Sequence, residues 1–222
     1  MKVYGEAVFD VCYLVIALVV GIYILVKSKN RLGRLMGIAI LVLGCGDAFH
    51  LVPRVLNNFV DSNFTSALGI GKLITSITMT IFYIFIYYIY KEHYSKESNK
   101  KLECFIWALA IFRIILCLLP QNRWMTNDGS VTIGIIRNIP FVMLGLLIVV
   151  LFYKGRKVDN IFKNMWLYIT FSFLFYIPVV VGAQFIPALG MFMLPKTICY
   201  ILIIFSFKKY IKNLVKSEME YQ

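Results

Sequence analysis

The chain has 222 residues, of which 60% are hydrophobic and only 15% are charged, and its mean hydropathy is +0.80. A soluble domain of this length carries roughly a quarter charged residues, so the composition argues against a soluble globular fold. The formal net charge of +12 would suggest a nucleic-acid partner in a soluble protein, but the positions of the basic residues indicate a different role.

Seven apolar segments follow one another along the chain, each long enough to cross a bilayer, which takes about 20 mostly apolar residues. The segments are 5–27, 35–56, 66–90, 102–119, 131–153, 161–186 and 190–208. The short connections between them leave no room for a second domain. The sequence therefore predicts one all-α domain over residues 1–222, a multi-pass bundle of seven transmembrane helices.

The first segment, 5–27, carries Glu6 and Asp10 within its apolar run. Lys2 gives it the slightly positive start of a signal peptide, but the two carboxylates, the length of the run and the lack of a small-x-small cleavage site argue for a retained helix. Glu6 could simply be the solvated start of that helix. Asp10 lies one turn deeper and is a candidate ligand-binding residue.

The second segment, 35–56, contains the stretch LGCGDAFHLVPR, in which Asp47, His50 and Arg54 lie within eight residues. Their i, i+3, i+7 spacing places all three on one stripe of a helix. Gly44 and Gly46 beside them would let another helix or a ligand approach the backbone closely. We interpret this stretch as one wall of a site.

The later segments each add polar or ionisable side chains. A charge at the bilayer centre costs about 2.5–3.5 kcal/mol on insertion scales, so such residues are expected to face the bundle interior and to mark a site. They are Lys72 in the third segment, Arg113 in the fourth, Arg137 and Asn138 in the fifth, Gln184 in the sixth, and Lys196 and Tyr200 in the seventh.

The basic residues outside the segments predict the orientation. Short loops rich in Lys and Arg stay in the cytoplasm. Four groups of four occupy alternate connections and the tail: Lys27, Lys29, Arg31 and Arg34; Lys91, Lys96, Lys100 and Lys101; Lys154, Arg156, Lys157 and Lys163; Lys208, Lys209, Lys212 and Lys216. The intervening loops hold only Arg123. We therefore expect a cell-membrane protein with its N-terminus outside and its C-terminus in the cytoplasm, and basic loops that contact anionic lipid rather than nucleic acid.

In this orientation, all the charges inside the segments fall in the outer half of the bundle, which predicts a shared polar chamber open to the outside. Its basic members are Arg54, Lys72, Arg113, Arg137 and Lys196, and its acidic members are Glu6, Asp10 and Asp47. An unpaired buried charge is costly, so an excess of positive charge favours binding of an anion. Arg side chains match phosphate and carboxylate in geometry. The expected partners are membrane lipids and an anionic small molecule or lipid head group.

Three functions remain open. In a membrane enzyme acting on lipid, Asp47 and His50 would form the catalytic acid–base pair. The pair Gly46-Asp47 in an early helix resembles lysoplasmalogenases and alkaline ceramidases, but the resemblance covers two residues and implies no further roles. In a transporter, receptor or sensor, the cations would bind without catalysis. Lys196 in the seventh segment resembles the retinal anchor of microbial rhodopsins, but the aspartate of that family is replaced here by Phe192.

Structural roles without a ligand are also open. Arg54 could extend its head group to the outer interface, and Asp47 could pair with Arg113 or Lys196, or with His50, to hold the bundle together. The five cysteines form no CxxC pair and fit small apolar packing residues: Cys12, Cys45, Cys104, Cys117 and Cys199. His50 is the one histidine inside a segment. We therefore expect neither a metal site nor a cofactor.

Overall fold

The computed structural model describes residues 2–60, 62–94, 99–126, 129–158 and 160–220. These residues form seven α-helices and two short 3-10 helices, with no strand in the described ranges, which confirms the all-α fold class. The α-helices are α1 (Lys2–Lys27), α2 (Arg31–Phe59), α3 (Thr65–Tyr94), α4 (Lys100–Leu118), α5 (Val131–Gly155), α6 (Met165–Gly182) and α7 (Met193–Glu220). The 3-10 helices are η1 (Pro120–Asn122) and η2 (Pro187–Phe192).

Six of the seven α-helices are long and apolar enough to cross a membrane, whereas the sequence analysis predicted seven spans. The exception is α4, because every 18-residue window in it contains Lys101, Glu103 and Arg113. The outer surface is also that of a membrane protein. On α1, for example, Val8 is 63% exposed and Val19 is 61% exposed, and large apolar patches of this kind are rare on soluble monomers.

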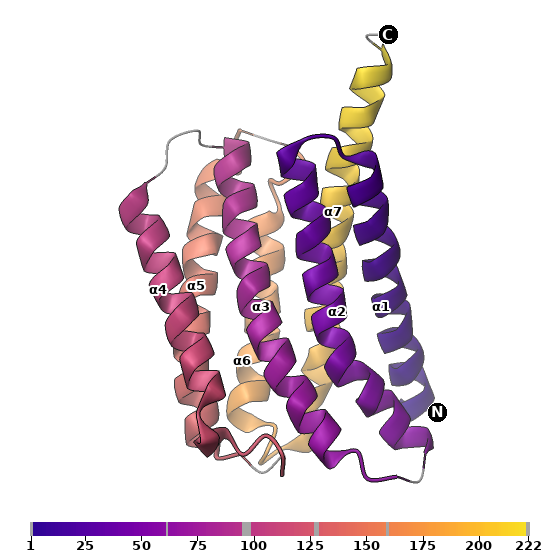
Figure 1. Cartoon of the computed structure of the whole chain (residues 1–222), viewed down its shortest axis with the longest axis vertical. Coiled ribbons are helices and arrows are strands. Elements are labelled where there is room, and N and C mark those ends of the chain that lie inside the picture. The colour runs from indigo at the N-terminus through magenta and orange to yellow at the C-terminus, as the bar shows by residue number, and fades with distance from the viewer. Residues whose placement is uncertain (1, 61, 95–98, 127–128, 159, 221–222) are drawn as a thin grey trace.

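The helix ends differ from the predicted segments mainly in the last third of the chain. Residues 161–164 form bends and turns rather than the start of α6, and residues 190–192, predicted to begin the seventh helix, belong to η2. At its other end, α7 continues to Glu220 and extends beyond the bundle (Figure 1). The predicted segment ended at 208 because apolar residues end there, but Lys is a good helix former and the helix does not need apolar residues to continue.

The helices form a closed ring in chain order, with α1 packed against both α2 and α7 (Figure 1). Inside this ring α3 also contacts α5, and α2 also contacts α7. The chain ends lie at opposite ends of the bundle, and the basic connections lie at the same end as the C-terminus (Figure 1). Lys96, one of the predicted basic residues, lies outside the described residues.

The apolar core fills the half of the bundle nearer the basic connections. On α3 the fully buried side chains Phe82, Ile86 and Ile89 come from its second half, and Phe152 and Phe207 occupy the corresponding levels of α5 and α7. The opposite half, where α3, α5 and α7 begin, carries the polar side chains. Large apolar residues thus seal one end of the bundle, and the other end retains a hollow.

Candidate functional site

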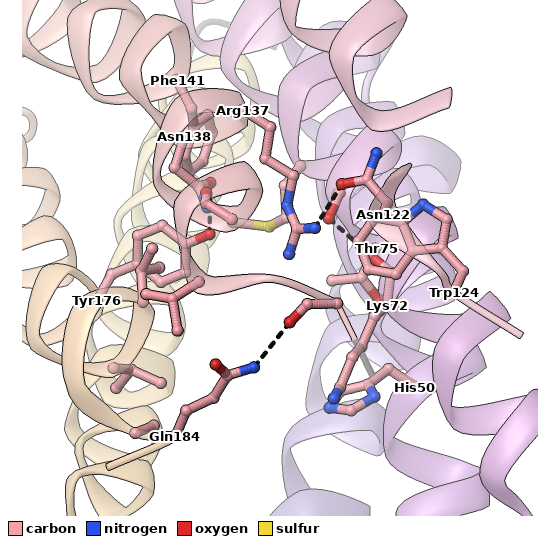
Figure 2. A pocket seen from close by; sticks show the side chains of 18 of the residues that line it. His50, Lys72, Thr75, Asn122, Trp124, Arg137, Asn138, Phe141, Tyr176 and Gln184 are labelled. Carbon is pink, nitrogen blue, oxygen red and sulfur yellow. Dashed lines mark hydrogen bonds between the residues drawn. The ribbon is translucent and has the colours of Figure 1, made fainter. Parts of the chain in front are cut away.

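A cavity of about 410 Å³ lies in the half of the bundle opposite the basic connections. Six helices, α2 to α7, contribute to its wall, together with the connection between α4 and α5 (Figure 2). Its charged and titratable lining residues are His50, Lys72, Arg113, Arg137 and Lys196. None of the described lining residues is acidic, so the side chains of the wall carry an excess of positive charge.

Arg113 is the most deeply buried of these cations, with only 2% of its surface exposed. Its guanidinium carbon lies 3.4 Å from the centre of the Phe141 ring, a cation–π contact. However, Nε and Nη1 of Arg113 have no hydrogen-bond partner among the described residues. Buried guanidinium nitrogens are normally paired, so this side chain is poised to receive an acceptor from a ligand.

Arg137 is held in place by the connection between α4 and α5. Its Nη1 donates to Oδ1 of Asn122 at 2.6 Å, and its guanidinium carbon lies 4.3 Å from the centre of the Trp124 ring (Figure 2). The Asn122 amide nitrogen donates in turn to the carbonyls of Leu116 and Leu119, at 2.7 and 2.9 Å. The last carbonyls of a helix lack intrahelical partners, and Asn122 supplies donors to those of α4. The same residue also lines the cavity.

Lys196 approaches the cavity from the first turns of α7 and is 8% exposed. Its Nζ lies 4.3 Å from the centre of the Tyr176 ring and 5.6 Å from that of Tyr200. The Tyr176 hydroxyl donates to Oδ1 of Asn138 at 2.7 Å, and the Asn138 amide donates to the Gly134 carbonyl at 2.8 Å (Figure 2). Tyr176 of α6, which is hydrogen-bonded to Asn138 of α5, thus presents its ring to the ammonium group.

No carboxylate of the described residues forms an ion pair within 4.0 Å with Arg113, Arg137 or Lys196. The alternative in which Asp47 pairs with Arg113 or Lys196 is therefore not found in this structure. Within the described ranges, no three His, Cys, Asp or Glu side chains gather as they would around a metal ion. The chemistry of the cavity is that of its cations and hydrogen-bond donors.

The connection between α4 and α5 closes the end of the cavity. Trp124 donates its indole N–H to the Cys117 carbonyl at 2.8 Å, and Ser66 at the start of α3 donates to the Met125 carbonyl at 3.2 Å. A Cβ on Gly69 would overlap the backbone carbonyl of Trp124, so only glycine admits the connection this close to α3. Gln184, just after α6, donates to the Gly129 carbonyl at 2.9 Å and fixes the other side (Figure 2).

The structure brings seven of the predicted site residues to this one cavity: His50, Lys72, Arg113, Arg137, Asn138, Gln184 and Lys196. The four other predicted site residues, Asp10, Asp47, Arg54 and Tyr200, are not among its lining residues. The predicted site residues therefore fall into two neighbouring arrangements: a cationic cavity among α2 to α7, and a cluster between α1 and α2 that contains the acidic side chains.

In the cluster between α1 and α2, Arg54 lies 2.8 Å from Oε1 of Glu6 and 3.9 Å from Oδ2 of Asp10. Asp47 accepts a hydrogen bond of 2.7 Å from the hydroxyl of the buried Tyr13 on α1. Glu6, Asp10 and Asp47 thus have their nearest partners between α1 and α2, although Asp47 also acts electrostatically on Lys196. Tyr200 is 3% exposed and packs edge-on against Phe82 in the core.

No hydrogen bond joins Asp47 to His50 in the described part of the chain, although both lie on one stripe of α2. Asp47 is bonded to α1, whereas His50 lines the cavity and its Nδ1 has no partner among the described residues. The expectation that Gly46 allows a close helix approach holds, because a Cβ there would overlap Thr78 of α3.

The sequence pattern did not predict four residues of the cavity wall: Asn122, Trp124, Phe141 and Tyr176. Asn122 and Trp124 flank Arg123 in a connection that contains no other predicted site residue. The available signal was that Asn122 follows a helix end whose carbonyls need donors. Tyr176 could have been noticed as a hydroxyl within an otherwise apolar stretch of α6, two residues before Pro178.

Comparisons with family models, with curated proteins and with solved structures returned no match for this chain.

Proposed function

We propose that this chain is a membrane protein that binds an anionic ligand, through a phosphate or carboxylate group, in the cavity among α2 to α7. The supporting observation is that Lys72, Arg113, Arg137 and Lys196 all line one hollow in which no described residue is acidic, and that the last three have no described carboxylate within 4.0 Å. A buried excess of positive charge is costly without a counter-charge. An anion in the cavity provides that counter-charge.

The wall suits an oxyanion in its geometry as well as its charge. Arg113 offers N–H donors that no described protein group accepts, and Arg side chains form bidentate hydrogen bonds with carboxylate and phosphate. Lys196 adds a second positive charge, whose ammonium group lies against the Tyr176 and Tyr200 rings and has no described carboxylate within 4.0 Å. The volume of about 410 Å³ lies within the range of small-molecule sites.

Binding by a transporter, receptor or sensor has more support than hydrolysis. A lipid-modifying enzyme would need Asp47 to work with His50, yet Asp47 accepts its hydrogen bond from Tyr13 and does not line the cavity. One observation still favours an enzyme: His50 lines the cavity, and its Nδ1 has no hydrogen-bond partner among the described residues. Replacement of His50 by Ala distinguishes the two, because a binder keeps ligand affinity whereas an enzyme loses turnover.

We also infer that α4 is a seventh span and that the N-terminus lies outside. Each charge of α4 avoids lipid: Lys100 and Lys101 lie at the basic end, Glu103 pairs with Lys91 at 2.8 Å, and Arg113 faces the cavity. Short loops rich in Lys and Arg favour the cytoplasm. Single cysteines introduced at Arg123 and at Lys100 in a cysteine-free background test this. A membrane-impermeant thiol reagent should label intact cells at position 123 and not at position 100; the reverse pattern contradicts the orientation.

Phosphate binding tests the main proposal directly. In detergent solution, inorganic phosphate should raise the thermal unfolding midpoint of the purified protein in a concentration-dependent way, because a ligand that binds only the folded state stabilises it. Sodium chloride at matched ionic strength is the control for general salt effects. Lys196→Met should abolish most of the shift, whereas Arg34→Met, at an exposed position near the basic end, should not. Equal shifts with phosphate and chloride would contradict the proposal.

A further inference from the structure

A second hollow, of about 280 Å³, lies between α5 and α6 on the outer side of the ring. Its wall is apolar except at one end, with Ile139, Met143, Ile177 and Val181 among its lining residues. These four side chains are between 42% and 53% exposed, so the hollow is a groove that faces the surrounding membrane. We call it the α5–α6 groove.

The α5–α6 groove adjoins the cationic cavity. Asn138, Tyr176 and Val180 line both, so the two hollows share one wall. Figure 2 shows Asn138 and Tyr176 at the side of the cavity where α5 and α6 meet. The hydrogen bond between their side chains is, in the described part of the chain, the one side-chain bond that joins α5 to α6. The shared wall between cavity and groove thus contains this hydrogen-bonded pair and the aliphatic side chain of Val180.

Farther toward the basic end, the same two helices are sealed. The ring of Phe173 on α6 packs so closely on Gly145 of α5 that a Cβ there would overlap it. Both residues are buried, and Phe141 and Tyr83 pack on the same ring. The opening between α5 and α6 thus lies only at the level of the cavity, and not along the whole pair of helices.

We propose that the ligand is an anionic lipid, whose charged head group enters the cationic cavity and whose hydrocarbon chain lies in the α5–α6 groove. The inference rests on the proposed function and narrows it. A small water-soluble anion would account for the four cations of the cavity. It has no apolar part that could occupy the groove beside them. A lipid phosphate or carboxylate satisfies both surfaces at once: negative charge at Arg113 and Lys196, and acyl chain against Ile139 and Ile177.

The route follows from the same arrangement. A lipid in the outer half of the membrane meets the groove with its chain already in apolar surroundings, so the chain crosses no polar barrier. Only the head group has to pass the Asn138–Tyr176 pair, whose amide and hydroxyl can form hydrogen bonds with a phosphate as it passes. Beyond that pair lies the ammonium group of Lys196, 4.3 Å from the Tyr176 ring.

A photoreactive lipid tests the inference. Lysophosphatidic acid with a diazirine in its acyl chain is incorporated into phosphatidylcholine vesicles that contain the full-length protein, and the crosslinked peptides are mapped by mass spectrometry. We expect crosslinks concentrated at 139–143 and 177–181. A monoacylglycerol with the same photoreactive chain is the control. Charge-assisted hydrogen bonds to the phosphate should make labelling of these peptides at least about tenfold stronger than with the uncharged control.

A matched pair of variants adds a second criterion. Ile177→Trp places a large ring in the groove, whereas Leu174→Trp adds the same ring at an exposed position on α6 that does not line it. Ile177→Trp should reduce the crosslinking of lysophosphatidic acid severalfold and leave the stabilisation by inorganic phosphate unchanged. Leu174→Trp should change neither.

The outcomes separate this inference from the proposed function. If phosphate stabilises the protein but labelling is spread around the ring or is equal for both lipids, the lipid inference is wrong and the anion site stands. If phosphate has no effect and labelling is also uniform, both are wrong. The comparison of the two lipids uses the wild-type protein, so it decides the question even if the Ile177→Trp protein does not fold.

Discussion

Replacement of Arg113 by Met provides the sharpest test of the idea that the cations exist for a ligand. Met retains an unbranched stem like that of Arg without the guanidinium group, and it fills irregular apolar space well. Arg113 is 2% exposed, and two of its guanidinium nitrogens have no partner among the described residues. If its role is to bind an anion, the protein without ligand should be more stable without this charge.

The size of the effect can be estimated from the contacts. Each buried donor left unsatisfied costs about 1–3 kcal/mol, so two such groups in Arg113 cost about 2–6 kcal/mol. The cation–π contact with Phe141 offsets about 2 kcal/mol of this cost. The Arg113→Met protein should therefore be more stable than the wild type by about 0–4 kcal/mol, which agrees with the range measured when buried charges are replaced by apolar residues in other proteins.

The same substitution should weaken phosphate binding. A hydrogen bond to a charged partner is worth about 1.5–3 kcal/mol, equivalent to an affinity loss of about 10- to 150-fold. Both quantities come from one assay, in which the unfolding midpoint in detergent is measured over a range of phosphate concentrations. Without phosphate the Arg113→Met protein should unfold at the same or a higher temperature than the wild type, and at high phosphate the order should reverse.

Two results would refute this reasoning. If Arg113→Met lowers the stability of the ligand-free protein by more than about 2 kcal/mol, Arg113 supports the fold and its charge is compensated in a way that the contacts do not account for. If phosphate stabilises variant and wild type equally, the anion binds elsewhere. Arg34→Met, which removes an exposed charge at the basic end, should leave both stability and phosphate response unchanged.

Three further predictions concern the surroundings of the cavity. Tyr13→Phe should lower the free energy of unfolding by about 1–3 kcal/mol, measured by denaturant titration, because the Asp47 carboxylate loses its 2.7 Å donor. Gly69→Ala should destabilise by about 1–3 kcal/mol in the same assay, because the new methyl group displaces the connection over the cavity, whereas Gly5→Ala, where a Cβ meets open space, should not. Arg54→Gln should reduce stability but change phosphate affinity by less than about twofold, measured by the phosphate dependence of the unfolding midpoint, because Arg54 does not line the cavity.

The controls for these predictions lie in the same helices. Tyr23→Phe on α1 removes a hydroxyl from a side chain that is 36% exposed and should be neutral. A Tyr13→Phe protein as stable as the wild type would show that Asp47 is satisfied by other means. A large loss of phosphate affinity in Arg54→Gln would show that the paired cluster and the cavity act as one site, as the sequence alone had suggested.

The presence of each helix could be predicted from the sequence, because it depends on the composition of that segment alone. Runs of apolar residues near 20 in length form helices in a membrane whatever their neighbours are, since backbone groups must be satisfied within the segment. The same logic placed Lys72, Arg113, Arg137 and Lys196 away from lipid, because each is costly there. Helix ends were less well predicted: α7 continues past Lys208 into a polar stretch that hydropathy does not register.

The hydrogen-bond and ion-pair partners of the polar side chains on α2 did not follow from the sequence. They depend on which neighbouring helix lies beside each side chain. Spacing alone placed Asp47 and His50 on one face of α2, but that face meets α1 on one side and the cavity on the other. Tyr13 therefore takes the carboxylate and leaves the imidazole at the wall. The same holds for Arg54, whose carboxylate partners come from α1 and could not be chosen from spacing.

By itself the sequence determined that the chain is helical, that it is built for lipid and that it carries costly charges toward one end of the bundle. Each of these properties depends on the composition of individual segments and not on how the segments pack together. Only the tertiary structure decided that the acidic side chains pair near α1 while the cations are left around a separate cavity beside an apolar groove. That separation depends on the angular position of each helix in the ring, which is set by packing between segments far apart in the chain.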